Sequence, residues 1–373
     1  MTRIRVRLDA PRDRSYSVEI RPGLFSSLPE MLLKDAGEGR LFIVTDATVA
    51  RLYARDIVRR LRDAGTAPKL LVVPSGERSK SERVAYRLQS RLLREGIRRD
   101  SLIVAFGGGV VGDLAGYVAA TVLRGVRFVQ VPTTLLAQVD SSVGGKVGID
   151  HPSGKNLIGA FHQPVSVYCD PLVLRTLAPR EFRNGLAEVI KIAAALDAGF
   201  FAYIEEHAGN ISRSNTRILT TLIERSVALK ASIVEQDERE SGLRAALNLG
   251  HTIGHALEAS GGFALKHGEG VAIGLAAEAR MASAMHLLPD EECTRLIGTL
   301  RKTGLPTELP KKVRAGRFLA SLALDKKGSW TGARFVFLRK IGTSALGIEV
   351  PEELIRKSIG LGSINRVRRR KPR

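Results

Sequence analysis

Residues 103–123 constrain the fold of this chain more than any other segment. The segment is long enough to span a bilayer and is nearly free of charge, but Asp113 lies in its middle and glycines interrupt it repeatedly. Glycine is a poor helix former, and a carboxylate is costly in a lipid core. We therefore interpret the segment as a buried strand, a glycine turn and a helix.

The first half of the chain alternates short β-branched runs with amphipathic stretches. Strands are predicted at residues 41–45, 70–73, 101–106 and 127–131. Within residues 79–96, Val84, Leu88 and Leu92 recur every four positions and Gly96 follows as a stop signal, which predicts a covering helix. This alternation is typical of a mostly parallel sheet with helices on both faces.

Strand signals nearly vanish after about Pro179, and helical patterns take over, with a short hairpin predicted near residues 335–348. A chain of 373 residues more often forms two domains than one. We predict an α/β fold with an N-terminal Rossmann-like domain over residues 1–179, which packs directly against a mainly α-helical domain over residues 180–360 and encloses a cleft with it. Residues 361–373 form a basic tail without apolar periodicity, which we expect to be disordered.

The formal net charge is +20, and six of the positive residues lie in the tail at residues 366–373. The other basic residues are scattered and only 5% of residues are aromatic, so the sequence contains no recognisable basic helix or stacking motif for nucleic acid. We expect no dedicated nucleic-acid or membrane partner. The excess of Lys and Arg suits small acidic metabolites instead.

Cys169 and Cys293 are the only cysteines, and they lie far apart without CxxC spacing. This indicates neither a disulfide scaffold nor a zinc ribbon. The first 14 residues are too densely charged to contain the apolar core of a signal peptide. Both observations predict a protein of the reducing cytoplasm.

A glycine motif follows the strand predicted at residues 101–106. Gly107, Gly109 and Gly112 match the dinucleotide pattern GxGxxG in the required place, between a predicted strand and a predicted helix. The acidic residue expected some 20 positions later is missing, but Asp46 ends an earlier strand and could hold a ribose hydroxyl. The alternative is a tight glycine turn with close helix packing.

Residues 133–156 are unusually rich in polar and glycine residues for a segment that follows a buried strand. Loops of this composition commonly line sites. Asp140 could coordinate or accept a proton, whereas Lys146, Lys155 and Asn156 could bind a phosphate or another anion. The alternative is a solvated loop with ordinary surface lysines.

Histidines and a carboxylate in the second half have the spacing of metal ligands. His251 and His255 share one helical face, and His267 follows shortly afterwards. Together with a distant Glu, they form a plausible zinc or cobalt set that leaves a position open for substrate. The residues between the first two histidines exclude the metalloprotease motif HExxH. Satisfied core histidines are the alternative.

Glu188 and Lys191 lie three residues apart amid apolar neighbours and share one face of a predicted helix. They are either part of a site or a simple surface ion pair.

Read together, these segments resemble the 3-dehydroquinate synthase family over nearly the whole chain, from about residue 16 to residue 354. The matching text is PSGERSK at residues 74–80, the long run from GGGVVGD to SGKNLIGAF at residues 107–161, REFRNGLAEVIK at residues 180–191, GLRAALNLGHTIGHALE at residues 242–258 and KHGEG at residues 266–270. Matches of this length are specific.

The resemblance implies a set of site residues. Those that bind the divalent metal, zinc or cobalt, are Glu188, His251 and His267. Those of the NAD site are Asp46, Glu77, Lys80, Gly107, Gly108, Gly109, Asp113, Thr133, Thr134, Asp140, Lys146 and Lys155. Those that bind substrate are Asp140, Lys146, Asn156, Lys191, Lys230, Arg244, Asn248, His255 and one of the pair Lys326 and Lys327, with Lys326 preferred. Arg124 resembles the arginine that reaches the partner subunit's phosphate site, which implies a homodimer.

The resemblance also implies the reaction. The enzyme would convert 3-deoxy-D-arabino-heptulosonate 7-phosphate to 3-dehydroquinate and phosphate, by transient oxidation with NAD, phosphate elimination, reduction, ring opening and intramolecular aldol closure. One alternative is a related sugar phosphate cyclase, acting on sedoheptulose 7-phosphate or an amino analogue, because Ile192 and Ala193 depart from the commonest family pattern. Others are a metal-dependent alcohol or glycerol dehydrogenase and a binding protein with a structural metal.

Overall fold

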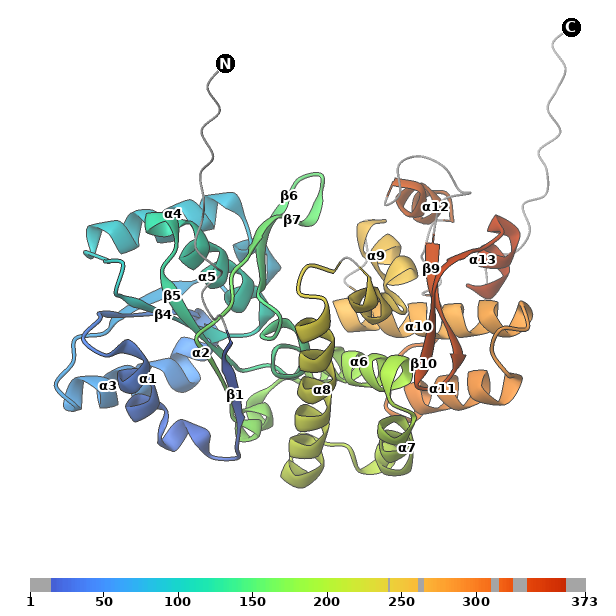
Figure 1. Ribbon diagram of the computed structural model, residues 1–373, viewed down its shortest axis with the longest axis horizontal. Helices are drawn as coiled ribbons and strands as arrows, with labels where there is room; N and C mark the ends of the chain where they lie inside the picture. The colour runs from blue at the N-terminus through green and yellow to red at the C-terminus, as the bar shows by residue number, and fades with distance from the viewer. Residues whose placement is uncertain (1–14, 241, 261–264, 310–314, 325–333, 360–373) are drawn as a thin grey trace, which may run out of the picture.

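The computed structural model describes residues 15–240, 242–260, 265–309, 315–324 and 334–359 (Figure 1). The basic tail predicted to be disordered lies outside these ranges. A sheet with its covering helices forms one half of the molecule, and a helical assembly forms the other (Figure 1). The helix α6, Pro179–Leu196, begins where strand signals fade in the sequence.

Six strands form one sheet in the order β1-β8-β5-β4-β2-β3, and every neighbouring pair is parallel. Their bounds are Ser17–Ile20 for β1, Leu41–Asp46 for β2, Lys69–Val73 for β3, Leu102–Gly107 for β4, Arg127–Pro132 for β5 and Ser166–Cys169 for β8. The four strands predicted from the sequence are confirmed to within one residue at each end. The sequence did not reveal β1 and β8, which are only four residues long and carry little pattern.

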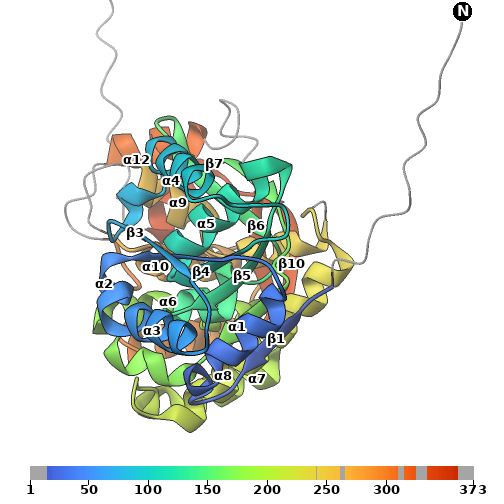
Figure 2. The same ribbon diagram turned by 90° about the vertical axis from the view of Figure 1, so that its left-hand side faces the viewer.

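Helices cover both faces of the sheet, because successive side chains of a strand point to opposite faces. On one face, Phe42 packs in a core with α4 and α5, and on the other, Ile43 packs in a core with α1 and α3. Figure 2 shows the two pairs of helices on either side of the strands. Their bounds are Leu28–Ala36 for α1, Arg55–Asp63 for α3, Glu82–Arg94 for α4 and Gly109–Thr121 for α5.

Residues 103–123 are a strand, a glycine turn and a helix, as predicted. They form most of β4, the turn at Gly108 and the whole of α5. Within the described residues, no helix is long and apolar enough to cross a membrane.

The second half is mainly helical, as predicted, and contains the short hairpin. Its helices are α6, α7 at Ala198–His207, α8 at Thr216–Gln236, α9 at His251–Ala259, α10 at His267–Ala284, α11 at Asp290–Lys302, α12 at Ala315–Leu324 and α13 at Glu352–Ser358. The hairpin pairs β9, Arg334–Lys340, with β10, Thr343–Glu349. The helical core also includes Leu135, Val139 and Val143, which follow β5, so this segment of the first half packs into the core of the second.

The prediction of a polar loop at residues 133–156 is wrong for much of that segment. It contains a helical turn at Ala137–Ser141 and the first strand of an antiparallel hairpin, β6 at Lys146–His151 and β7 at Gly154–Phe161. Val147 and Ile149 lie two positions apart on β6 and join the core under α5, which gives the hairpin an apolar face despite its polar composition.

Close packing of α9 against α10 depends on glycine. A Cβ atom at Gly274 of α10 would lie 1.9 Å from the carbonyl oxygen of Gly250, the residue before α9. A Cβ atom at Gly254 would lie 3.0 Å from the backbone of Gly270. The helices that begin with His251 and His267 are therefore held at backbone contact.

We predict that Gly274→Ala lowers the free energy of unfolding by about 1–3 kcal/mol or more, because the added Cβ atom forces the two backbones apart. Urea unfolding followed by circular dichroism measures this. The control is Gly298→Ala in α11, where a Cβ atom meets nothing within 4 Å and helix propensity favours alanine. Equal stability of the two variants would contradict the packing argument.

Candidate active site

The carboxyl ends of β2, β4 and β5 bring the predicted nucleotide-binding residues to one edge of the sheet. Asp46 ends β2, Gly107 ends β4, and the backbone N–H of Thr133, just after β5, donates to the carbonyl of Gly107 at 2.9 Å. The chain order reverses between β2 and β4, since β3 lies on the far side of β2. Ligands of parallel α/β sheets bind at such a switch point.

The Asp46 carboxylate accepts hydrogen bonds from the backbone N–H of Thr48 at 2.7 Å and from the hydroxyl of Ser75 at 2.8 Å. It therefore caps the helical turn that follows β2 and faces the segment after β3, where Glu77 lies. Asp46, predicted from the sequence as a possible ribose ligand, lies beside the glycine turn of β4 because β2 and β4 pair directly.

Close packing alone requires glycine at two positions after β4. A Cβ atom at Gly108 would lie 2.8 Å from Thr134, and one at Gly112 would lie 2.7 Å from the side chain of Gln130. The close-packing alternative is therefore real at these two positions. It does not exclude ligand binding, because α5 begins at Gly109 and directs its free N–H groups to the same edge.

Lys80 connects this edge with the β6–β7 hairpin. Its buried ammonium group forms an ion pair with Asp113 at 2.5 Å and donates a hydrogen bond to the side-chain oxygen of Asn156. Burial raises the pKa of Asp113, although the charge of Lys80 opposes this effect. Asn156 has a φ of 57°, in the left-handed region, and its side-chain oxygen accepts the Lys80 hydrogen bond. The structure thus places Asn156, predicted to bind substrate, among residues predicted to bind NAD.

Cationic side chains gather between the hairpin and the helical half. The ammonium group of Lys230 on α8 lies 2.6 Å from an Asp140 carboxylate oxygen and is nearly buried. Arg244, also buried, donates to the carbonyl oxygen of Glu238 at 2.7 Å. Lys146 begins β6, and burial followed by the charges of Arg244 and Lys230 lowers its pKa to about 8. Cations that depress one another's pKa form an anion-binding environment.

Two of these predicted substrate residues share a partner that the sequence analysis missed. The ammonium group of Lys146 forms an ion pair with Glu240, and Asn248 donates from its side-chain amide to the same carboxylate at 2.8 Å. Glu240 is a non-glycine residue with a φ of 59°. The Glu240 carboxylate therefore lies between two side chains that were predicted to bind the anionic substrate.

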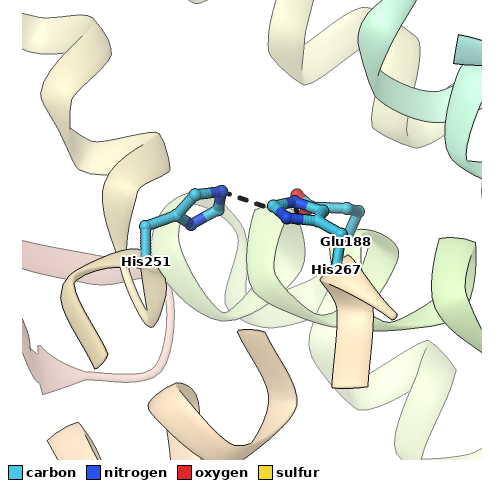
Figure 3. A group of neighbouring side chains, drawn as sticks. All are labelled: Glu188, His251 and His267. Atoms are coloured by element: carbon cyan, nitrogen blue, oxygen red, sulfur yellow. Dashed lines mark hydrogen bonds and ion pairs between the residues drawn. The ribbon is translucent and has the colours of Figure 1, made fainter. Parts of the chain in front are cut away.

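Three helices converge on a buried carboxylate. Glu188 of α6 is fully buried, and its oxygen Oε1 lies 3.1 Å from Nε2 of His267 and 3.7 Å from Nε2 of His251 (Figure 3). The other oxygen of Glu188 pairs with the Lys191 ammonium group at 2.5 Å. Lys191 is only 2% exposed, so the alternative of a simple surface ion pair is wrong.

The electrostatics of this cluster follow from burial and from opposite charge. Burial alone would raise the pKa of Glu188, but Lys191 and the two imidazoles outweigh it and hold that pKa well below its usual range. Burial and then the charge of Lys191 lower the pKa of His251 to about 3. Burial also opposes protonation of His267, yet its hydrogen bonds to Glu188 and Glu258 raise its pKa to about 10.

The donor set fits a divalent transition metal. One ligand atom each from Glu188, His251 and His267 lie within 4.8 Å of one another. One carboxylate and two imidazoles are typical of a zinc or cobalt site that keeps a position for substrate. A second group with the same mutual distances is made of His255, Glu258 and His267. His267 belongs to both groups, through its two ring nitrogens.

The remaining predicted residues lie beside this cluster, in the turn after α5 or outside the described residues. His255 is exposed on α9, and its ring centre lies 5.0 Å from that of His251. Lys155 lies on β7 and pairs with Glu258 at 2.7 Å. Arg124 is exposed in the turn after α5. Lys326 and Lys327 lie outside the described residues.

Two further buried carboxylates support the histidines and were not found from the sequence. Glu258 hydrogen-bonds to His267, and Glu278 of α10 accepts from the backbone N–H of Gly250 at 2.6 Å, immediately before His251. Glu258 lies seven residues after His251 and three after His255, so helical periodicity alone could have placed it on the same face of the helix. No comparable signal marks Glu278.

The chain is similar to known proteins over almost its full length. Residues 70–184 match the family profile described as 3-dehydroquinate synthase N-terminal, and residues 185–328 match the one described as 3-dehydroquinate synthase C-terminal. A 3-dehydroquinate synthase of Pelobacter propionicus is 45% identical over 344 residues, which cover 92% of this chain and 96% of the relative.

Solved structures of other sugar cyclases have the same fold. A 2-epi-5-epi-valiolone synthase from Streptomyces hygroscopicus, with NAD⁺ and Zn²⁺ bound, superposes with a TM-score of 0.85 at 28% identity, covering 95% of this chain and 98% of that chain. A 2-deoxy-scyllo-inosose synthase complexed with carbaglucose-6-phosphate, NAD⁺ and Co²⁺ gives a TM-score of 0.83 at 26% identity, covering 92% and 95%.

We predict that Lys191→Met destabilises the metal-free protein by about 3–5 kcal/mol, because it leaves the buried Glu188 carboxylate without its strongest cation. Urea unfolding in the presence of a chelator measures the change. The matched control is Lys69→Met, which removes an exposed ion pair with Glu95 and should leave the unfolding midpoint unchanged. An unchanged midpoint for Lys191→Met would contradict the electrostatic account of this cluster.

Proposed function

The chain belongs to the 3-dehydroquinate synthase family, and from this premise we propose how its own residues perform the family reaction. The enzyme converts 3-deoxy-D-arabino-heptulosonate 7-phosphate to 3-dehydroquinate and inorganic phosphate. The reaction belongs to the shikimate pathway of aromatic amino acid biosynthesis.

Glu188, His251 and His267 hold the divalent metal, zinc or cobalt, in this proposal. The support is their donor chemistry, their mutual distances and the metal bound by the two solved cyclases. NAD lies along the carboxyl edge of β2, β4 and β5. Its proposed ligands are Asp46, Glu77, Lys80, Gly107, Gly108, Gly109, Asp113, Thr133, Thr134, Asp140, Lys146 and Lys155.

The substrate lies between these two sites. A metal held by Glu188, His251 and His267 would supply Lewis-acid chemistry at a carbinol of the substrate, and NAD at the sheet edge would supply reversible hydride transfer at the same carbon. The chain itself supplies positive charge for the phosphate and carboxylate of the substrate, chiefly from Lys146, Lys230 and Arg244. These groups also offset the negative charge that develops on the substrate as its C–H proton is lost. Lys191, Asn156, Asn248, His255 and Lys326 complete the proposed substrate-binding set.

The departing phosphate of the substrate is the proposed proton acceptor in the elimination. The carboxylates beside the proposed substrate site are already engaged: Asp140 pairs with Lys230, and Glu188 pairs with Lys191. A carboxylate held by a cation is a weak base, because its pKa is depressed. The substrate phosphate carries its own acceptor oxygens to the site of proton removal.

One observation carries this proposal most directly. Lys191 pairs with the metal-binding carboxylate Glu188, and its charge also acts on Asp140 and Lys146. The metal site and the anion-binding residues are therefore one continuous electrostatic unit. A cyclase that acts on a phosphorylated sugar acid needs that combination, whereas a structural metal site does not.

We also propose that the enzyme is a cytoplasmic homodimer in which Arg124 reaches the phosphate site of the partner subunit. Arg124 is exposed, and it follows Leu123 with both residues at positive φ, 50° and 64°. Within the described part of the chain, its guanidinium forms no hydrogen bond or ion pair. Both cysteines are buried and unpaired, which suits a reducing compartment.

The purified protein, supplied with NAD and zinc or cobalt, should release inorganic phosphate from 3-deoxy-D-arabino-heptulosonate 7-phosphate without net NADH formation. Dehydroquinate should be the product. His251→Ala and Lys146→Ala should abolish turnover while leaving the circular dichroism spectrum unchanged. Phosphate release from sedoheptulose 7-phosphate alone would identify a cyclase with a different substrate, and net NADH formation would identify a dehydrogenase.

The pH dependence of kcat/KM should report the Lys146 ammonium group. Its pKa of about 8 is lower than usual, so it loses its positive charge, and with it the attraction for the anionic substrate, as the pH rises through that value. We expect kcat/KM of the wild type to fall above about pH 8. In Lys146→Arg, whose guanidinium stays charged, this fall should move to higher pH. An identical profile in both proteins would exclude Lys146 as its origin.

A further inference from the structure

Glu258 is a buried carboxylate for which the proposed reaction has no role. It lies on α9, and only 6% of its side chain is exposed. One oxygen lies 2.9 Å from Nδ1 of His267, and the other accepts a hydrogen bond from the Lys155 ammonium group at 2.7 Å. The ammonium group of Lys155 therefore pairs with Glu258 as a carboxylate.

An ionised carboxylate can only accept a hydrogen bond, so Nδ1 of His267 must be the donor in this contact. Nδ1 therefore carries a proton, and Nε2 of His267 is the nitrogen that faces Glu188 at 3.1 Å. His251 is arranged in the same way, because its Nδ1 lies 3.2 Å from the carbonyl oxygen of Leu249 and its Nε2 faces Glu188. The two imidazoles differ in what their Nδ1 atoms contact: a charged carboxylate for His267 and a neutral carbonyl oxygen for His251.

Lys155 gives Glu258 a connection to the other half of the molecule. It belongs to β7, in the hairpin that projects from the sheet half (Figure 1). Asn156, the next residue, accepts a hydrogen bond from Lys80 at the edge proposed to bind NAD. The hydrogen bonds therefore run from the hairpin through Lys155 and Glu258 to the ring of His267.

We propose that Glu258 is a positioning residue that fixes the tautomer and ring orientation of His267 for metal binding, and that Lys155 holds Glu258 in place for this task. This inference rests on the metal site proposed above. A carboxylate behind a metal-binding imidazole orients the ring and increases its basicity as a ligand. The hairpin of the sheet half thus takes part in setting the metal affinity of the helical half.

The test is the zinc affinity of the metal-free, full-length protein, measured by competition with a chromophoric chelator, together with the visible absorption spectrum of the cobalt form. Glu258→Gln should weaken zinc binding by about 10–100-fold and change the cobalt spectrum, because an amide is neutral and is a weaker acceptor. Lys155→Met should weaken binding in the same direction and by less, since Glu258 keeps its charge.

The matched control is Glu205→Gln, which removes a carboxylate paired with Arg295 at 2.8 Å, and it should bind zinc as tightly as the wild type. Wild-type affinity and an unaltered cobalt spectrum in folded Glu258→Gln would overturn the proposal. If that variant does not fold, Lys155→Met decides, because its side chain is half exposed and its loss is tolerable. Unchanged zinc affinity in Lys155→Met would then overturn the proposal.

His251→Ala separates this inference from the proposed function. A large loss of zinc affinity in His251→Ala, with none in Glu258→Gln, would leave the metal site intact as a proposal and remove only the role of Glu258. An unchanged zinc affinity in His251→Ala would instead remove the proposed metal site itself.

Discussion

The burial of the Glu188 carboxylate is the constraint on which the rest of the site depends. A carboxylate removed from water is costly unless charges and hydrogen bonds replace its hydration. Here Lys191 of the same helix pairs with one oxygen, and His251 and His267 face the other. The two histidines begin α9 and α10, so the second oxygen keeps its imidazole partners only while the three helices stay in register.

Glycine maintains that register. The backbones of Gly250 and Gly274 meet closely, and a Cβ atom at Gly268, the residue after His267, would lie 2.1 Å from the carbonyl oxygen of Asn184 on α6. The amide side chain of Asn184 also accepts a hydrogen bond from the N–H of Gly268 at 2.5 Å. Small residues thus allow α6, α9 and α10 to approach closely enough for their polar side chains to share one position.

Much of this arrangement could be predicted from the sequence. The alternation of β-branched runs and amphipathic helices indicated the parallel sheet, because short apolar runs and period-3.6 patterns are local signals. The spacing of His251 and His255 indicated one helical face, and that of Glu188 and Lys191 indicated a face of an earlier helix. The structure brings Glu188 and His267 together from 79 residues apart, which local patterns could not show and which the family resemblance supplied.

Other features depend on tertiary contacts that leave no local trace. The β6–β7 hairpin was mistaken for a loop because its polar and glycine-rich sequence hides the two apolar residues that pack under α5. The pairs Lys146–Glu240 and Lys155–Glu258 were missed because each joins a lysine of the first half to a carboxylate of the second. Charged side chains that the sequence predicts to be solvent-exposed are half-buried where the two halves of the molecule meet.

The central claim is that one metal ion binds where α6, α9 and α10 converge. Crystals grown with NAD and cobalt would test it through anomalous scattering at the cobalt absorption edge. The account predicts a single strong peak at about 2.0–2.2 Å from Nε2 of His251, Nε2 of His267 and the Glu188 carboxylate. A peak held instead by His255 and Glu258, or no peak among these side chains, would contradict it.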